Sequence, residues 1–414
     1  PGLETESGWH QQECARPPFN PAPDYDGLDL SRYLQVQDST NPAHRLWSDG
    51  LWNKFMMAHG CYWRRCTFCD TSLDYISRYQ PGHATTLVDH VERIVRTTGQ
   101  TGFHFVDEAA PPRVMRDFAL ELMAREVQIS WWGNIRFEKA FTPDLARLLA
   151  ASGLIAVSGG MEVLSDRLLR LMQKGVSISQ LVDACVAFQN AGVLVHAYLM
   201  YGFPSQTRDE FLEAMETARQ FFVHGLIDSG FWHRFVLTRH SPIFRDPNTY
   251  GLKLKDDVRG SFANNDVDHT DDVGVNPDSY DEPLAQSIAH WMEGQELERS
   301  VGDWFDPPRP LPTLPAPFAT PHLELHQMQP DERLIWIGGK VLETKTTLVL
   351  HGTDSETIVT GSATDRNWLA EIIDTCSPDM PPTTWKEIRA SYSGNWQELQ
   401  PLWEQVRLAG LLAV

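Results

Sequence analysis

Three of the six cysteines of the chain stand within nine residues, in the stretch HGCYWRRCTFCD at residues 59–70. Their spacing is C-x4-C-x2-C, which would make Cys61, Cys66 and Cys69 a set of thiolate ligands. Thiolates are the ligands that soft metal centres prefer. The stretch therefore predicts a metal centre, and the kind of centre depends on where a further ligand is found.

Four interpretations compete for these thiols. A zinc site needs four ligands, and His59, which is only two residues from Cys61, would give poor tetrahedral geometry. Two-iron ferredoxins share the spacing but take a distant fourth cysteine, and the next one here, Cys185, falls on an apolar helical face that favours a core position. Three unliganded thiols fit poorly with a loop at a functional face. A four-iron cluster held by three cysteines leaves one iron open for another ligand and needs no fourth cysteine.

Six short apolar runs alternate with helical patterns in the first 250 residues. Among the helix signals, Thr142-Pro143 is an N-cap followed by proline, and residues 207–210 form a capping box. Such alternation predicts right-handed βαβ units and a parallel sheet. Six units can close partly into a (β/α)6 TIM-like barrel, and a doubly wound open sheet is the rival that strand count alone does not exclude. The expected strands are residues 54–58, 102–106, 128–132, 154–158, 193–199 and 231–237.

The unusual polar residues come directly after these expected strands. In parallel α/β folds, the loops at the carboxyl ends of the strands converge on one face, and that face holds the site. The sequence therefore predicts one site built from the ends of all six strands. In chain order, the residues that follow the strands are the cysteine stretch, Asp107-Glu108, Asn134 with Arg136, Gly159-Gly160-Met161-Glu162, Tyr201-Gly202-Phe203-Pro204, and Arg239 with His240.

Two features within the expected strands concern the interior of the barrel. His104 is predicted to be a hydrogen-bonded core histidine rather than a ligand. Trp131 and Trp132 are adjacent in sequence, so they face opposite sides of their strand. At most one of the two tryptophans therefore points into the barrel.

The rest of the chain divides by composition. Residues 1–50 are Pro-rich and polar and predict an irregular leader before the barrel at 51–250. Residues 251–305 combine an acid-rich loop, expected either over the site face or as a solvated surface loop, with a helical extension. A Pro-rich linker at 306–321 precedes a small α+β domain at 322–414, which we expect to be winged-helix-like.

Composition also bounds the partners and the compartment. The net charge is −20, which argues against a large nucleic-acid footprint because such footprints need clustered Lys and Arg. No apolar run reaches the length of a membrane span, so no membrane partner is expected. Six unevenly spread cysteines in 414 residues do not make a disulfide framework, which favours the cytoplasm. The chain opens on Pro1 rather than Met, so we expect it to be a fragment of a longer protein, and whether an upstream domain is missing stays open.

Over residues 50–245 the chain resembles the radical S-adenosylmethionine (SAM) enzymes, most closely the branch that often carries an N-terminal cobalamin-binding domain. The leader is similar to the segment that joins the cobalamin domain of that branch to its barrel. The family pattern is C-x3-C-x2-C, so the loop of this chain carries one extra residue. The resemblance rests on features in the family's order: the cysteine loop with Phe68 before its last cysteine, Asp107-Glu108, Gly159-Gly160-Met161-Glu162 with Ser165, Lys174-Gly175, and Gly202-Phe203-Pro204 with Gln206-Thr207.

The resemblance implies a [4Fe-4S] cluster and SAM as cofactors, and it leaves cobalamin open as a third. The open iron would chelate the amine and carboxylate of SAM. One electron from the reduced cluster would then cleave the sulfonium to give a 5′-deoxyadenosyl radical, which abstracts a substrate hydrogen. The protein would position the groups and exclude water.

The resemblance also implies residue roles by matched position. Cys61, Cys66 and Cys69 would ligate the cluster, and Asp107, Glu108 and Tyr201 are the candidate catalytic residues. Structural roles stay open as alternatives. Arg136 could form an ion pair with Glu138 or Glu162, and Gly159-Gly160 could form an ordinary turn. Asp107 and Glu108 could be a solvated pair, and Tyr201 could be an aromatic residue at the barrel rim. Cofactor contacts are implied for Phe68, for Arg136 through the SAM carboxylate, for Gly159, Gly160, Glu162 and Ser165, and, around adenine, for Tyr201, Gly202 and Phe203.

Three functions are compatible with the sequence. The leading hypothesis is a radical SAM enzyme that methylates or rearranges a small molecule or peptide at an unactivated carbon, with electrons from a flavodoxin- or ferredoxin-type donor. The second is a non-catalytic iron–sulfur or zinc scaffold, which would not need the glycines after the fourth strand. The third is a nucleic-acid binder that uses the C-terminal domain as a winged helix. The acidic candidate helix at 365–376 counts against the third.

Overall fold

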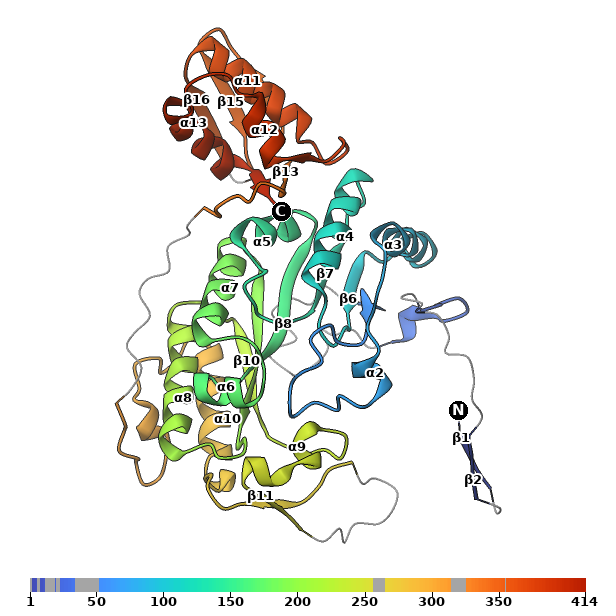
Figure 1. The fold of residues 1–414 in the computed structure, drawn as a ribbon, viewed down its shortest axis with the longest axis vertical. Coiled ribbons are helices and arrows are strands. Elements are labelled where there is room, and N and C mark those ends of the chain that lie inside the picture. The colour runs from blue at the N-terminus through green and yellow to red at the C-terminus, as the bar shows by residue number, and fades with distance from the viewer. Residues whose placement is uncertain are drawn as a thin grey trace.

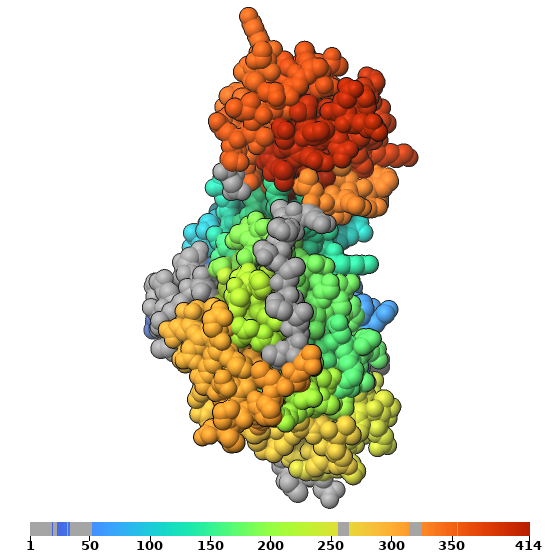
Figure 2. All heavy atoms as spheres, turned by 90° about the vertical axis from the view of Figure 1, so that its left-hand side faces the viewer, coloured from blue at the N-terminus to red at the C-terminus, as the bar shows by residue number. Residues whose placement is uncertain are grey.

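The computed structural model covers 414 residues and describes residues 2–5, 8–11, 19, 23–33, 52–255, 265–313, 325–353 and 355–414. Figure 1 shows two parts, a sheet covered by helices and, above it, a smaller domain formed by the C-terminal residues. In the space-filling view of Figure 2, the C-terminal domain forms a lobe at one end of the long axis.

Six parallel strands form the central sheet in the order β10-β9-β8-β7-β6-β3. This order follows the chain without reversal, whereas a doubly wound sheet reverses direction at a switch point. The sequential order therefore supports the partial TIM-like barrel and excludes the doubly wound open sheet. The strands are β3 (Asn53–Phe55), β6 (Gly102–Phe105), β7 (Ser130–Ile135), β8 (Leu154–Glu162), β9 (Leu194–Tyr201) and β10 (Ser229–Arg234).

Helices between the strands cover the outer face of the sheet, as the alternation predicts. The hydroxyl of Thr142 accepts a hydrogen bond from the Leu145 amide at 3.2 Å, and Thr207 and Glu210 form the expected capping box. These caps satisfy backbone amides that a helix start leaves unpaired. The helices are α3 (Ala84–Thr98), α4 (Pro112–Ala124), α5 (Pro143–Ala151), α6 (Asp166–Leu171), α7 (Ile178–Asn190), α8 (Arg208–Val223) and α10 (Asp281–Met292).

The main core lies between the sheet and these helices. The Phe105 ring packs at 5.3 Å from Phe118 of α4 and 5.4 Å from Trp131. Trp132 instead stacks on His104 across β6 and β7, with ring centroids 3.5 Å apart. The two tryptophans therefore face opposite sides of β7, which confirms the prediction.

The C-terminal domain is α+β, as predicted, and its winged-helix-like character stays a prediction. It contains two three-stranded sheets, ordered β17-β13-β18 and β14-β15-β16, and a hydrophobic core of its own. Its elements are β13 (Arg333–Trp336), β14 (Val341–Glu343), β15 (Thr347–His351), β16 (Glu356–Thr360), α11 (Ala363–Thr375), β17 (Thr383–Thr384), α12 (Trp385–Ser391), α13 (Trp396–Ala409) and β18 (Leu411–Ala413).

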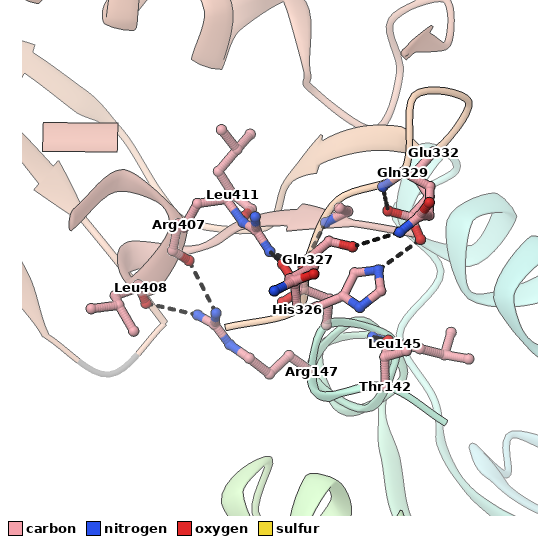
Figure 3. A network of polar contacts seen from close by, with 12 residues as sticks. Thr142, Leu145, Arg147, His326, Gln327, Gln329, Glu332, Arg407, Leu408 and Leu411 are labelled. Atoms are coloured by element: carbon pink, nitrogen blue, oxygen red, sulfur yellow. Dashed lines mark hydrogen bonds and ion pairs between the residues drawn. The ribbon is translucent and has the colours of Figure 1, made fainter. Parts of the chain in front are cut away.

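This domain docks on α5 through a polar network (Figure 3). Arg147 donates to the backbone carbonyls of Arg407 at 3.1 Å and Leu408 at 2.9 Å. Arg407 forms an ion pair with Asp144 at the start of α5, and both side chains are almost fully buried. In Figure 1 the domain lies beyond α5, whereas α2 (Asp74–Ser77), which follows the cysteine loop, lies in the lower half of the molecule.

The remaining segments are short. The leader, predicted to be irregular, contains an antiparallel hairpin of β1 (Gly2–Thr5) and β2 (Gly8–Gln11) and a 3-10 turn at Leu30–Arg32, and its residues 34–50 lie outside the described residues. Residues 256–264 of the acid-rich loop and residues 314–324, which include half of the linker, also lie outside them. Of the helices in the described ranges, none combines the length and apolar character that crossing a bilayer requires. The other elements are β4 (Ala58–His59), β5 (Gln80–Pro81), α9 (Pro242–Arg245), β11 (Leu252–Leu254), β12 (His269–Asp271) and 3-10 turns at Pro247–Tyr250, Pro277–Ser279 and Val301–Trp304.

Candidate active site

A cavity of about 350 Å³ opens at the carboxyl ends of the strands. The cysteine loop and the ends of β6, β7 and β8 all contribute to its lining, as expected for the site face of such a barrel. Ten residues that were given a role from the sequence come together here: Cys61, Cys66, Phe68, Cys69, Asp107, Glu108, Arg136, Gly159, Gly160 and Glu162.

The cysteine loop is fixed to two neighbouring segments. The Thr67 amide donates to the Met172 carbonyl at 2.9 Å, and the Ile243 amide donates to the Thr67 carbonyl at 3.1 Å. At the end of the loop, the buried Asp70 carboxylate accepts a hydrogen bond from the Thr238 hydroxyl. These bonds tie the loop to the segments that follow α6 and β10.

Trp63 anchors the middle of the same loop. Its indole Nε1 donates to the Gln173 carbonyl at 2.8 Å. The guanidinium carbon of Arg136 lies 4.3 Å from the centre of its ring, within cation–π range. A Cβ at Gly175 would stand 2.1 Å from the indole, so the glycine of Lys174-Gly175 provides the space that Trp63 occupies.

The four residues between Cys61 and Cys66 include one with a left-handed backbone conformation. Arg64 has a φ of 53°, a conformation that residues other than glycine adopt uncommonly. Its Nη1 donates to the Ser77 carbonyl at 2.9 Å. The loop thereby absorbs its extra residue in a local turn while both cysteines still line the cavity.

The Cys66 and Cys69 thiols are hydrogen-bonded to each other. This bond lowers the pKa of Cys66, whereas the same bond and burial raise the pKa of Cys69. The thiolate is the form that binds metal. Within the described ranges, no three His, Cys, Asp or Glu side chains surround a single ion. A cluster whose three thiolates bind three different irons does not need that arrangement, so the donor set fits a [4Fe-4S] centre.

The two candidate fourth ligands are engaged elsewhere. His59 Nε2 lies 3.0 Å from Asp74 Oδ2, on the α2 side of the loop. Cys185 is fully buried in α7, where burial raises the pKa of its thiol. The core assignment of Cys185 is confirmed, and neither the zinc nor the two-iron interpretation gains a ligand from these residues.

The end of β8 carries a buried ion pair. The register with β9 shifts between Gly160 and Glu162, and such irregularities re-aim side chains. Glu162 Oε1 accepts a hydrogen bond from Lys174 Nζ at 2.6 Å. Burial disfavours the charged ammonium, but the Glu162 carboxylate holds the pKa of Lys174 above its ordinary value. The cavity therefore has a fixed charge pair in its wall.

The two glycines of β8 make room for this arrangement. A Cβ on Gly160 would stand 2.0 Å from Glu162 Oε1, and a Cβ on Gly159 would stand 2.4 Å from the Ile135 carbonyl oxygen. Neither contact is compatible with a side chain. Backbone packing thus requires glycine at 159, whereas a side chain at 160 would displace the Glu162–Lys174 pair. The contact of either glycine with a cofactor stays a prediction.

Arg136 is held by protein groups. Its two terminal nitrogens donate to the Lys174 carbonyl at 3.0 and 2.8 Å, and Nη2 lies 3.4 Å from Glu138. The ion pair with Glu138, which the sequence left open as an alternative, is therefore present. A contact of Arg136 with the SAM carboxylate stays a prediction.

The acidic pair after β6 divides into two roles. Asp107 is buried, and its Oδ1 accepts hydrogen bonds from the Met57 amide at 3.0 Å and the Ala58 amide at 2.7 Å. Burial raises the pKa of Asp107 to about 7, against the effect of those amides. Glu108 is exposed to the cavity, and burial raises its pKa as well. Asp107 supports the backbone before the cysteine loop, and Glu108 is the more accessible acid.

Four residues with implied cofactor roles do not line this cavity. Ser165 caps α6 by accepting a hydrogen bond from the Leu168 amide at 3.4 Å. Tyr201 is buried in the outer core and donates to Asp281 at 2.6 Å, so neither its catalytic role nor its position at the barrel rim gains support. Gly202 lines a neighbouring cavity, and Phe203 belongs to a separate apolar cluster.

Several cavity residues had no role assigned from sequence: Tyr198, His233, Lys174, Asn134 and Arg64. Side chains alternate along a strand, so once the register of β9 is known, Tyr198 points in and Tyr201 points out. The sequence singled out Tyr201 of β9, whereas Tyr198 is the tyrosine of that strand that lines this cavity. The sequence did mark Lys174, because the Lys174-Gly175 dipeptide is one of the features that resemble the family.

Two curated proteins are similar to part of the chain. The uncharacterized methyltransferase PH0819 of Pyrococcus horikoshii is 24% identical over 223 residues, which are 52% of this chain and 45% of that protein. The bacteriochlorophyllide d C-12(1)-methyltransferase of Chlorobaculum tepidum is 26% identical over 153 residues, 35% of this chain and 33% of that protein. The chain thus spans less than half the length of either relative.

Solved structures show a distant likeness. The radical S-adenosylmethionine methyltransferase TsrM from Kitasatospora setae, with cobalamin and a [4Fe-4S] cluster bound, gives a TM-score of 0.42 at 18% identity over 50% of this chain and 43% of that one. The cobalamin-dependent S-adenosylmethionine radical enzyme OxsB gives 0.43 at 14% identity over 58% and 41%.

The family comparison covers the site itself. Residues 56–218 match the family model described as the radical SAM superfamily. The matched stretch runs from the start of the cysteine loop through β8 and β9 and into α8. The superfamily's cofactors are a [4Fe-4S] cluster and SAM. The three cysteines and the other lining residues of the cavity, apart from His233, lie within the match. Residues 56–218 of this chain are therefore a domain of the radical SAM superfamily.

Proposed function

We propose that the protein is a radical SAM methyltransferase that modifies an unactivated carbon of a small molecule or peptide. The observation that carries this proposal is the convergence of three cysteines, two glycines and a buried ion pair on one cavity at the carboxyl ends of the strands. The superfamily assignment of residues 56–218 supports the radical chemistry. The names of the two similar curated proteins support methyl transfer over rearrangement.

Cys61, Cys66 and Cys69 would hold the cluster, and the cavity beside them would receive SAM. When bound, this pair supplies reductive cleavage of SAM, which requires one electron from a flavodoxin- or ferredoxin-type donor. The protein's own part is to orient the reactants and keep water away. The buried Lys174–Glu162 pair and Arg136 make a rigid wall for that purpose.

Cobalamin enters the proposal as a methyl carrier. The similar solved structures include cobalamin-bound enzymes by their descriptions. The described residues of this chain do not themselves suggest which side chains would hold it. A cobalamin requirement is therefore to be measured rather than derived.

Methyl transfer is tested with SAM that carries a trideuterated methyl group. The full chain is reconstituted anaerobically with iron and sulfide, reduced, and incubated with and without hydroxocobalamin, which brings no methyl group of its own, and with an extract of small molecules and peptides. We expect a product heavier by a CD3 group in place of hydrogen, detected by mass spectrometry. Production of 5′-deoxyadenosine without any labelled product would contradict methyl transfer and favour a rearrangement.

The scaffold hypothesis predicts a different result in the same reaction. A non-catalytic iron–sulfur protein would bind the cluster but release neither 5′-deoxyadenosine nor a labelled product. The nucleic-acid hypothesis has no observation in its favour, because α11 of the C-terminal domain carries three acidic residues and one arginine. The radical enzyme is the function that the site supports best.

A further inference from the structure

The inner face of the sheet is polar and aromatic. Along β6 and β7, the apolar side chains of Phe103, Phe105 and Trp131 point outward into the main core. The interior of a complete (β/α)8 barrel is normally filled by layers of branched aliphatic side chains. Here many of the alternate, inward positions carry polar or aromatic side chains, among them His104, Trp132, Asn134, Tyr198 and Phe231.

Four inward-facing residues form a continuous ring surface on β9 and β10, which we call the inner wall: His196, Tyr198, Phe231 and His233. Tyr198 lies beside Phe231 in the strand register. Their ring centroids are 5.4 Å apart, His196 is 5.0 Å from Tyr198, and Phe231 is 6.0 Å from His233. These separations are typical of packed aromatic pairs.

The inner wall is open to a ligand. Phe231 has 46% of its surface exposed. Its neighbour Gly230 faces α10, because a Cβ there would stand 3.4 Å from Ile288, so Phe231 points to the opposite, inner side. Tyr198 and His233 line the cavity that also contains the three cysteines. The wall therefore extends from the cysteine cavity into the barrel interior.

We propose that the inner wall is a stacking surface for a planar conjugated ring, and that the substrate of this protein carries such a ring. A flat ring gains apolar burial against Phe231 and Tyr198 and also the ring–ring interaction that a saturated group lacks. The ring belongs either to a small molecule or to an aromatic side chain of a peptide. This inference rests on the proposed function, since it places the substrate beside the cysteine cavity.

The chemistry of the cavity limits what the ring carries. Asp107 and Glu108 lie at the β6 side of the cavity, whereas Arg64, Arg136 and Lys174 line other parts of it. Burial lowers the pKa of His233, which leaves a neutral imidazole in the wall at neutral pH. A ring with a hydrogen-bond donor that reaches Glu108 matches the acidic side of this lining.

Ring preference is measured with a matched pair of neutral probes, 2-naphthol and its saturated counterpart decahydro-2-naphthol. Dissociation constants are determined by anaerobic equilibrium dialysis against the reconstituted full chain. The saturated probe exposes more apolar surface, so hydrophobic burial alone would favour it. We expect 2-naphthol to bind about three- to tenfold more tightly, the range that an aromatic pair contributes.

Variants locate the binding surface. Phe231→Leu should weaken the binding of 2-naphthol about three- to tenfold and leave the binding of the saturated probe nearly unchanged. Phe231→Tyr should retain the preference for 2-naphthol. Trp396→Leu, in the C-terminal domain, removes an aromatic ring far from the barrel and should change neither constant. Equal binding of the two probes, no binding of either, or a preference that survives Phe231→Leu would overturn the proposal.

The proposed function and the proposed stacking surface are tested by different measurements. Probe binding needs no catalysis. A ring preference without 5′-deoxyadenosine formation would therefore contradict the proposed enzyme activity but not the proposed stacking surface. SAM cleavage with no ring preference would contradict only the stacking surface.

Discussion

At the scale of single residues, Lys174 joins the parts of the site. Its ammonium pairs with Glu162, and its carbonyl accepts both hydrogen bonds from Arg136. The next residue, Gly175, leaves the space that Trp63 fills. A buried charge that loses its partner is strongly destabilising, so the groups around Lys174 depend on one another.

Gly160→Ala should disturb this pair directly. The new methyl group would overlap Glu162 Oε1 and approach Lys174 Nζ at 2.9 Å, so the ion pair must move. We expect a loss of about 1–3 kcal/mol in the free energy of unfolding, measured by chemical denaturation. Gly339→Ala is the matched control, because a Cβ there meets nothing closer than 3.5 Å. Equal stability of the two variants would contradict the packing argument.

Asp107 predicts a pH dependence of stability. Burial raises its pKa from 3.8 to about 7 in the folded chain, so between these values the folded state binds more protons than the unfolded state. The free energy of unfolding should therefore fall as pH rises from about 4 to 7 and level off above, by at most about 4 kcal/mol. Asp107→Asn should remove this slope.

The comparison is made by denaturation at several pH values. Other carboxyl groups titrate in both proteins, so the difference between the two curves reports Asp107 alone. Parallel curves for the native chain and Asp107→Asn would show that the carboxyl does not carry a raised pKa.

At the scale of elements, the cysteine loop depends on contacts from outside its own segment. Thr67 is bonded to Met172 and Ile243, which come from the ends of two different βα units. Trp63 adds a third contact, to Gln173. The loop can therefore carry a longer spacing than the family pattern and still present its cysteines to one cavity.

Trp63→Ala should loosen this loop. The variant loses the hydrogen bond to Gln173 and the ring beneath Arg136. We expect less iron per chain after reconstitution and a weaker change in the electron paramagnetic resonance spectrum of the reduced cluster on adding SAM. Trp63→Phe keeps a ring under Arg136, so its iron content and spectral change should lie between those of the native chain and of Trp63→Ala. Native iron content together with an unchanged spectral response in Trp63→Ala would refute the anchoring role.

Local patterns predicted the elements well, because each strand and helix has its own signal. The cap at Thr142 and the capping box at 207–210 are both present. The sequence did not single out Tyr198, because inward and outward positions depend on the strand register, which no local pattern specifies. Ser165 and Phe203 were taken from a family motif, and motif position does not determine which way a side chain points.

At the scale of the whole molecule, the C-terminal domain is joined to the barrel by buried charge as well as by apolar packing. Ile335 and Leu412 of that domain belong to the hydrophobic cluster of the barrel. Arg407 and Asp144 are 2% and 1% exposed, and Asp144 also accepts a hydrogen bond from the Ala413 amide at 2.8 Å. The two parts should therefore unfold as coupled units.

Arg407→Met should weaken this docking, because it leaves Asp144 buried without its cation. We expect a loss of about 3–5 kcal/mol, seen as a separate low-temperature transition in calorimetry and as faster proteolysis between the two parts. The double variant Asp144→Leu with Arg407→Met removes both charges and should recover most of the loss. A single variant as stable as the native chain would show that the ion pair does not support the docking.

The central claim is that the cavity around Cys61, Cys66 and Cys69 performs radical SAM chemistry. The most direct measurement is the formation of 5′-deoxyadenosine from SAM by the anaerobically reconstituted and reduced chain, compared with Cys66→Ala. We expect product from the native chain and none from the variant. A native chain that binds a cluster yet forms no 5′-deoxyadenosine, or a Cys66→Ala variant that forms it equally well, would contradict the claim.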